Sequence, residues 1–160
     1  MKINSILAIG VVMALSLVSF KPSDKEVQSE KRFGGLALYT VRDAMKDARA
    51  TLEKVAQAGY VNVESAGYEN GKFYNLSPSD FKSLLNEMKL TPISSHQGTV
   101  TFENIDQQIA DLKAAGFQYF VIPVPPMGLF GHDGSKMTMK GGAKNLAQIL
   151  DKLGEKCAAA

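Results

Sequence analysis

The sequence has one cysteine, two histidines and almost no excess of charge. A single cysteine, Cys157, cannot form a disulfide within the chain. Cys157 falls on the apolar stripe of the last expected helix, so we interpret it as a buried structural thiol rather than a nucleophile. The formal net charge of +2 gives no reason to expect a nucleic-acid partner. With 160 residues, 45% of them hydrophobic, the chain can form one domain or part of a larger one.

The longest apolar run lies at the N-terminus and is too short to span a bilayer comfortably. It covers residues 6–18, follows the positive charge of Lys2 and has the length of a signal-peptide core. We therefore expect residues 1–20 to be a signal peptide and the protein to be periplasmic or secreted. A buried N-terminal helix is the competing interpretation, and the cleavage site stays open.

No cysteine stands directly after this run, so a lipoprotein anchor is not supported. Residues 21–33 are charged and lack periodicity, which indicates a solvated linker. The folded part of the protein is therefore expected to begin at residue 34.

From residue 34 onward, short apolar strands alternate with amphipathic helices. Strands are expected at residues 34–40 and 61–65, in the stretch 91–98, and within residues 114–124. Strand and helix in alternation with short joins predict parallel strands linked by right-handed crossovers.

The helices between these strands are expected from apolar residues at spacings of three and four. The first helix ends at Gly59, and the third begins near Thr101. The second opens with a capping box formed by Ser77 and Asp80, with Pro78 at the first helical position. The residues expected on the buried helix faces are Met45, Ala48, Leu52, Val55, Phe81, Leu84, Leu85, Met88, Phe102, Ile105, Ile109, Leu112, Leu146, Ile149, Leu150, Leu153 and Cys157.

Two α/β architectures fit this alternation, an open doubly wound sheet and a (βα)8 barrel. Polar residues at the C-terminal ends of the strands favour the barrel, because barrels keep their chemistry on that face. These residues are Tyr39 and Arg42 after the first strand, Glu64 at the second, and His96 and Gln97 at the third, while the fourth strand ends in Pro123 before a long loop.

The third strand, TPISSHQG over residues 91–98, shows this change of character most clearly. The body of a strand that is buried on both faces must be apolar, whereas its last residues emerge at the mouth of a pocket and can be polar. We therefore place His96 at the mouth of a pocket.

Four segments resemble the sugar phosphate isomerase/epimerase family: LALYTVRDAMKD, TLEKVAQAGYVNVESAGY, SPSDFKSLLNEMKLTPISSHQG and DLKAAGFQYFVIP. Members of this family are similar to xylose isomerase and to the apurinic endonuclease barrels. The likeness covers nearly everything from residue 34 to the end. It implies a (βα)8 TIM barrel with a divalent metal at its C-terminal face, which moves a proton or hydride between adjacent carbons of a sugar or polyol.

The resemblance also implies roles for individual residues. Glu64 and His96 match the acid of the family's second strand and the histidine of its third strand, and we assign both as catalytic. Tyr39 and Arg42 match the family's YTxRD opening, and together with Gln97 they are assigned to substrate binding.

Each assignment has a structural alternative. The His96 ring could be satisfied by a neighbouring backbone group instead of contacting substrate or metal. Glu64 could form a salt bridge with an arginine or lysine of the neighbouring strand. Arg42 could simply pair with Asp43 or Glu69.

The chain departs from the family pattern because it carries four strand-helix units rather than eight. We expect residues 34–160 to be the N-terminal half of a xylose isomerase-like barrel that is inactive on its own. The family's metal ligands come from strands five to eight. The two histidines of this chain, His96 and His132, belong to no spaced ligand motif, so no metal ligand is assigned. His132 is interpreted as a solvated loop residue.

Three functions remain open from the sequence. The first is an exported isomerase or epimerase that acts on an unphosphorylated sugar or polyol. The second is a lyase or hydrolase of oxidised glycosides on the same barrel. The third is a non-catalytic half-barrel that binds a sugar weakly or associates with another chain, including a second copy of itself.

Overall fold

The computed structural model describes residues 33–124 and 128–160. The expected signal peptide and nearly all of the expected linker lie outside the described residues. Among the residues that are described, no helix combines the length and the apolar character needed to cross a membrane.

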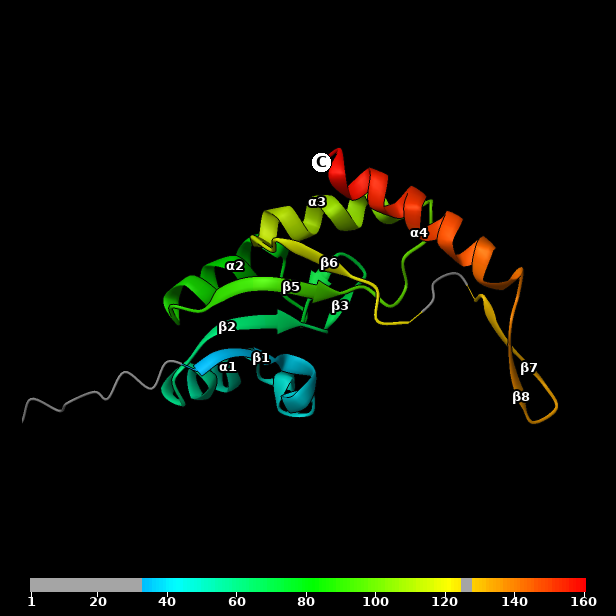
Figure 1. Cartoon of the computed structure of the whole chain (residues 1–160). Coiled ribbons are helices and arrows are strands. Elements are labelled where there is room, and N and C mark those ends of the chain that lie inside the picture. The colour runs from blue at the N-terminus through cyan, green and yellow to red at the C-terminus, as the bar shows by residue number, and fades with distance from the viewer. Residues whose placement is uncertain (1–32, 125–127) are drawn as a thin grey trace, which may run out of the picture.

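Four parallel strands form the central sheet (Figure 1). Their order across the sheet is the order in which the chain reaches them, without the reversal that defines a doubly wound sheet. This is the succession found in a (βα)8 barrel, so the α/β barrel-type fold predicted from the sequence is confirmed for four strand-helix units. The strands are β1 (Phe33–Ala37), β2 (Tyr60–Ser65), β5 (Thr91–His96) and β6 (Tyr119–Val121).

Three helices connect the consecutive strands of this sheet, and a fourth follows the last strand. As predicted, Ser77 caps the second helix by accepting a hydrogen bond from the Asp80 amide at 3.1 Å. Gly59 follows the first helix with φ +94°, a backbone conformation that favours glycine. The helices are α1 (Ala48–Gln57), α2 (Pro78–Glu87), α3 (Ile105–Ala115) and α4 (Gly142–Ala158), with short 3-10 turns at Leu38–Val41 and Ala44–Lys46.

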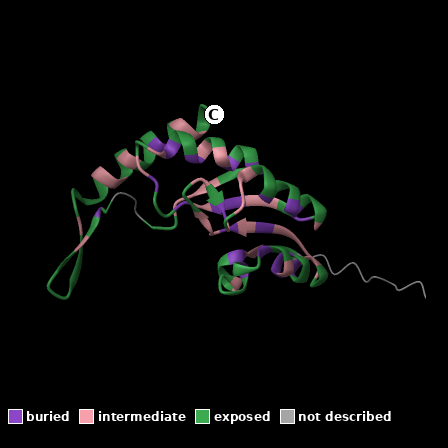
Figure 2. Ribbon diagram, turned by 180° about the vertical axis from the view of Figure 1, so that it is seen from behind, coloured by how far each residue is buried: buried purple, intermediate pink, exposed green. Residues whose placement is uncertain are grey.

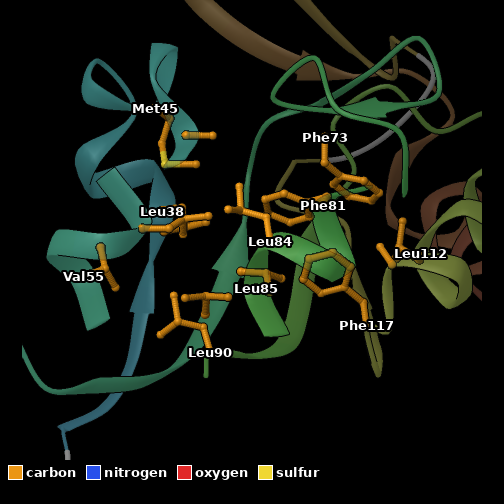
Figure 3. Close-up of a cluster of buried hydrophobic side chains, with 14 residues drawn as sticks. Leu38, Met45, Val55, Phe73, Phe81, Leu84, Leu85, Leu90, Leu112 and Phe117 are labelled. Carbon is orange, nitrogen blue, oxygen red and sulfur yellow. The ribbon is translucent and has the colours of Figure 1, made fainter. Parts of the chain in front are cut away.

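The main core lies between the sheet and helices α1, α2 and α3 (Figures 2 and 3). Phe81 is fully buried at its centre, and its ring stacks on that of Phe73 with 5.3 Å between centroids. Complete burial of a phenylalanine stabilises a fold by roughly 1.5–3 kcal/mol, so this aromatic group holds α2 firmly against the sheet. The predicted core residues that are confirmed as buried are Met45, Ala48, Leu52, Val55, Phe81, Leu84, Leu85, Ile105, Leu112 and Leu153.

A smaller cluster formed by Val100, Ile105 and Leu153 holds α4 against α3. Cys157 packs at the edge of this cluster and is only partly buried, so its predicted full burial is wrong in degree. Burial raises the pKa of the Cys157 thiol, which keeps it protonated and unreactive at neutral pH. The expectation that it is not a nucleophile agrees with this environment. Leu150, also predicted to be buried, is 40% exposed because α4 packs through only part of its apolar stripe.

Two predicted element boundaries are wrong. The first strand was expected to run to Thr40 but ends at Ala37, where the chain turns into a 3-10 helix that directs Leu38 into the core. The third helix begins at Ile105, not near Thr101, because the Asn104 side chain accepts a hydrogen bond from the Thr101 amide at 2.7 Å and closes a turn. Phe102 lies in this turn and is 37% exposed, so its predicted burial is also wrong.

Two β-hairpins were not predicted. The first joins β3 (Tyr68–Glu69) to β4 (Lys72–Phe73) through an Asn-Gly pair, which is a hairpin signal that the sequence did offer. The second joins β7 (Phe130–Asp133) to β8 (Lys136–Met139) and projects away from the body of the protein (Figure 1). His132 is exposed, as expected, but it lies on a strand and not in a loop.

Candidate active site

An irregularity in the pairing of β2 with β5 decides which side chains meet at the strand ends. Val63 pairs with Pro92, but the next residue, Glu64, pairs with Ser94, so β5 carries one extra residue at this point. Proline has no amide hydrogen for the ladder and is tolerated in strands mainly at such bulges. The bulge therefore places Ser94, and not Ile93, beside Glu64.

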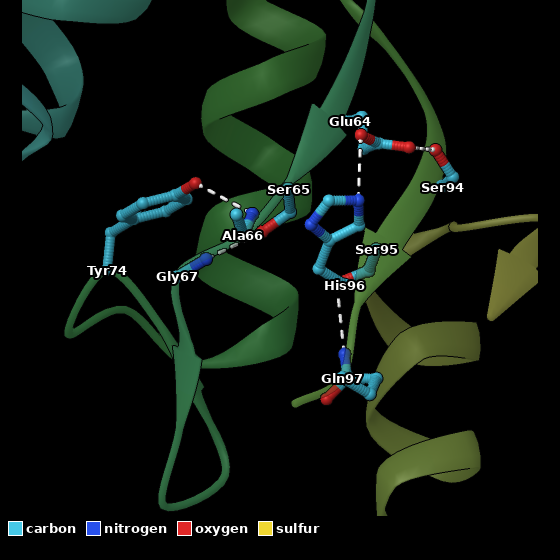
Figure 4. Close-up of polar contacts among 9 residues, drawn as sticks. All are labelled: Glu64, Ser65, Ala66, Gly67, Tyr74, Ser94, Ser95, His96 and Gln97. Carbon is cyan, nitrogen blue, oxygen red and sulfur yellow. Dashed lines mark hydrogen bonds and ion pairs between the residues drawn. The ribbon is translucent and has the colours of Figure 1, made fainter. Parts of the chain in front are cut away.

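Glu64 and His96 contact each other directly (Figure 4). His96 Nε2 lies 3.0 Å from Glu64 Oε1, and the Ser94 hydroxyl donates a hydrogen bond of 2.6 Å to Glu64 Oε2. The side chains of His96 and Glu64 are 28% and 29% exposed, so a ligand can reach them, whereas Ser94 is only 8% exposed. Glu64 and His96, both expected at the C-terminal ends of strands, are therefore in contact, and their catalytic roles stay predictions.

The pair lies on the face of the sheet that is opposite the main core. Val63 faces that core, and side chains alternate along a strand, so Glu64 points to the other face. On the next strand Tyr119 pairs with Ser94 and is 62% exposed. The face that carries Glu64 and His96 is therefore open to solvent at these positions.

Gln97 was predicted to bind substrate, but its side chain is buried. Its Nε2 donates a hydrogen bond of 3.0 Å to the Ser95 hydroxyl, and its Oε1 has no partner among the described residues. With about 1% of its surface exposed, Gln97 cannot touch a ligand without moving. Gln97 lies directly after β5 and is buried beside Ser95, not on the exposed face that carries Glu64 and His96.

Tyr39 and Arg42 lie at the same end of the sheet. Tyr39 lies two residues after Ala37, the residue of β1 that pairs with Glu64. The Arg42 guanidinium lies 4.7 Å from the centre of the exposed Tyr39 ring and donates a hydrogen bond to the Tyr39 carbonyl at 3.1 Å. No ion pair of Arg42 with an acidic residue is found in the described part of the chain, so the alternative of a simple pairing with a neighbouring carboxylate is not observed.

Two residues near the site were missed by the sequence analysis. Ser94 could have been found from strand periodicity, because it precedes His96 by two residues and so shares its face. Tyr74 had no such signal. Its hydroxyl accepts a hydrogen bond of 3.0 Å from the Ala66 amide, which fixes the loop that follows Glu64 and Ser65. Burial raises the pKa of the Tyr74 hydroxyl.

One hollow with charged walls lies away from this pair. A hollow of about 400 Å³ between α1 and α2 is lined by Lys46, Arg49, Asp80 and Glu87 among others, and neither Glu64 nor His96 borders it. Arg49 and Glu87 pair with each other across it at 2.7 Å. Because its opposite charges already satisfy one another, we assign no function to this hollow.

Comparison with known proteins bears on the fold. No family model and no curated protein matches the sequence. Solved structures that match include two sugar phosphate isomerase/epimerases from Parabacteroides distasonis ATCC 8503. The first gives a TM-score of 0.56 at 21% identity over 78% of this chain and 50% of that chain. The second gives 0.55 at 21% identity over 80% and 47%.

The chain has the fold of these isomerase/epimerase structures. The resemblance predicted from the sequence is therefore confirmed at the level of the fold. The chain spans about half the length of the solved structures that it matches, in agreement with the four strand-helix units of the sheet.

Proposed function

We propose that Glu64 and His96 are the proton-transfer pair of a sugar isomerase or epimerase site. The observation that carries this proposal is the 3.0 Å contact between His96 Nε2 and Glu64 Oε1 at the C-terminal ends of parallel strands. This is the face on which barrels of this type keep their active sites. The fold shared with isomerase/epimerase structures adds support.

The chemistry of such an enzyme needs groups of this kind. To move a carbonyl along a sugar, a proton must leave one carbon and be delivered to the neighbouring one. To invert a carbon next to the carbonyl, the carbon must lose a proton from one face and receive one on the opposite face. An imidazole can take up and release a proton near neutral pH, and a carboxylate beside it stabilises the positive ring that forms. In our proposal His96 exchanges the proton with the substrate, and Glu64 holds the ring and balances its charge.

The family resemblance implies a divalent metal, and the described residues do not fit one. Glu64 and His96 would supply two ligands, and no group of three potential ligands is found in residues 33–124 and 128–160. Three or more protein ligands are usual for a catalytic metal such as zinc. We therefore derive no step through a metal. A metal in the complete barrel would need ligands from beyond the described residues.

The ligand proposed for this site is an unphosphorylated sugar or polyol. The N-terminal signal predicted from the sequence would export the protein to the periplasm or the medium, where phosphorylated sugars are scarce substrates. The exposed Tyr39 ring and the Arg42 guanidinium beside it offer an apolar surface and hydrogen-bond donors to such a ligand. We propose these two residues as its binding partners, and Gln97 as a support for the strand end.

Two other functions use the same geometry. A lyase of oxidised glycosides also has to remove a proton next to a carbonyl, and a hydrolase of such substrates also needs an acid/base pair. Only analysis of the products would separate either from an isomerase. A non-catalytic half-barrel that binds a sugar weakly, or that pairs with another chain, is favoured by the open face of the sheet around Tyr119. The coding sequence downstream of residue 160 discriminates between these classes, because a continuing frame with His, Asp and Glu at strand ends favours the enzyme.

The proposal can be tested by titrating the ¹⁵N-labelled chain with aldoses, ketoses and polyols and following the amide and side-chain NMR signals. We expect shifts centred on Glu64, His96 and Tyr39, which Glu64→Gln weakens strongly. Glu69→Gln, an exposed carboxylate on β3, is the matched control and should change nothing. Shifts that avoid these positions, or that survive Glu64→Gln unchanged, would contradict the proposed site.

A further inference from the structure

The Ser94 hydroxyl makes a shorter contact with Glu64 than His96 does. Its donor oxygen lies 2.6 Å from Glu64 Oε2, against 3.0 Å from His96 Nε2 to Oε1. Ser94 is only 8% exposed, so little water can compete for this hydrogen bond. A hydroxyl that donates to a carboxylate forms one of the stronger hydrogen bonds in proteins.

The two contacts use different oxygens of one carboxylate (Figure 4). The last torsion of a glutamate is broad, so a carboxylate that is held at one oxygen still rotates. Held at both oxygens by Ser94 and His96, the carboxylate of Glu64 keeps Oε1 facing the imidazole ring.

The orientation of the carboxylate sets the state of the ring. A carboxylate has only acceptors, so Nε2 of His96 must carry the hydrogen in this contact. In a neutral imidazole the other nitrogen, Nδ1, is then the acceptor. No hydrogen bond to Nδ1 is found among the described residues, so this nitrogen is the one able to take a proton from a ligand.

We infer that Ser94 is a positioning residue, which locks Glu64 so that His96 is held with Nε2 protonated and Nδ1 as the base nitrogen. The inference rests on the proposed function, in which His96 exchanges a proton with the substrate. It also explains the effect of the bulge in β5. Without the extra residue, Ile93 would stand opposite Glu64 and would offer its carboxylate no hydrogen-bond donor.

The neighbouring serine provides a matched control. Ser95 is fully buried, but its side chain faces the opposite side of the strand and accepts a hydrogen bond from Gln97. Ser95→Ala therefore removes a buried hydroxyl one residue away without touching Glu64. Ser94→Thr keeps the hydroxyl and should behave like the unchanged protein.

The test is the exchange rate of the His96 Nε2 proton with water, measured by NMR on the ¹⁵N-labelled chain at about pH 8.5, where imidazoles are neutral. Ser94→Ala should accelerate this exchange about tenfold, because the Glu64 carboxylate loses its hydrogen bond from Ser94, can rotate, and leaves the His96 Nε2 proton open to water more often. Ser94→Thr and Ser95→Ala should leave it within twofold of the original rate. Unchanged exchange in Ser94→Ala, or equal acceleration in Ser95→Ala, would overturn the inference.

If Ser94→Ala does not fold, Ser94→Cys takes its place, because a thiol keeps the volume but is only a weak donor. Its exchange should also be faster, and exchange at the original rate would overturn the inference. None of these measurements needs a substrate. If Ser94 variants behave as expected while no sugar binds, the proposed function fails and the positioning survives. If sugars bind at Glu64 and His96 while the exchange rate of the His96 Nε2 proton is the same in the Ser94 variants as in the original chain, only the positioning role of Ser94 fails.

Discussion

Removal of His96 should cost the protein little stability, and this separates a site residue from a structural one. Its ring is 28% exposed, and its partner Glu64 is 29% exposed, so water screens their attraction. Ion pairs of this exposure typically contribute about 1 kcal/mol or less to folding. After His96→Ala, Glu64 still accepts the hydrogen bond from Ser94 and can be hydrated, so no buried charge is left without a partner.

The matched comparison is Phe81→Ala, which removes a side chain of similar size from the main core. Phe81 is fully buried against Phe73, Tyr74 and Phe117, with ring centroids 5.3, 5.6 and 6.3 Å away. Truncation of a buried phenylalanine to alanine costs roughly 3–5 kcal/mol, from lost transfer energy and from the cavity that remains. The structure therefore predicts a difference of at least about 2 kcal/mol between the two variants.

Urea denaturation of both variants, followed by circular dichroism, measures this difference in the free energy of unfolding. His96→Ala should also lose the sugar-induced NMR shifts expected at Glu64 and Tyr39. A loss of stability in His96→Ala as large as that in Phe81→Ala, with sugar binding unchanged, would show that His96 is structural and would refute the reasoning.

Other predictions concern the termini, the loops and the pH dependence. Exported protein should lack approximately residues 1–20, and an intact mass that retains the N-terminal methionine would refute this. The isolated chain should not isomerise any aldose or ketose in a reaction that a chelator abolishes and a divalent ion restores. Gly67→Ala should destabilise the chain by about 1–3 kcal/mol in urea, because a Cβ there would lie 2.1 Å from the Tyr74 ring. Burial and a hydrogen bond to a carboxylate raise the pKa of Tyr68, so it contributes stability below about pH 10 that is lost as the pH rises further. Tyr68→Phe should reduce this alkaline loss in urea titrations, whereas Tyr119→Phe, at an exposed position, should not.

Most of the fold could be predicted because local signals and packing agree. The spacing of three places Leu52 and Val55 on one face of the first helix, and the capping box begins the second helix at Ser77. Both signals depend only on residues that are close in the sequence. The errors occur where a side chain competes with the helix. Asn104 closes a turn with Thr101 and so delays the third helix, which leaves Phe102 outside the core.

The candidate site could be predicted in position but not in its contacts. Parallel strands bring their C-terminal ends to one edge, which was enough to expect Glu64 near His96. Whether Gln97 faces solvent or the interior depends on the path of the chain after β5, where its amide donates to the Val121 carbonyl at 2.8 Å. That hydrogen bond links the end of β5 to β6, and a contact between residues so far apart in the sequence cannot be predicted from the local pattern of residues around Gln97.

The bulge at Pro92 shows why residue types at the right spacing do not by themselves make a site. In a regular register Glu64 would face Ile93, and the carboxylate would have no hydroxyl to hold it. Proline removes one ladder donor, β5 gains a residue, and the register beyond this point shifts by one, so Ser94 stands opposite Glu64 with His96 next on the same face. The arrangement of Ser94, Glu64 and His96 thus depends on Pro92, a residue outside this group of three. Val63 and Glu64 face opposite sides of the sheet because side chains alternate along β2, and the bulge acts on β5, where it brings Ser94 and His96 to the face that carries Glu64.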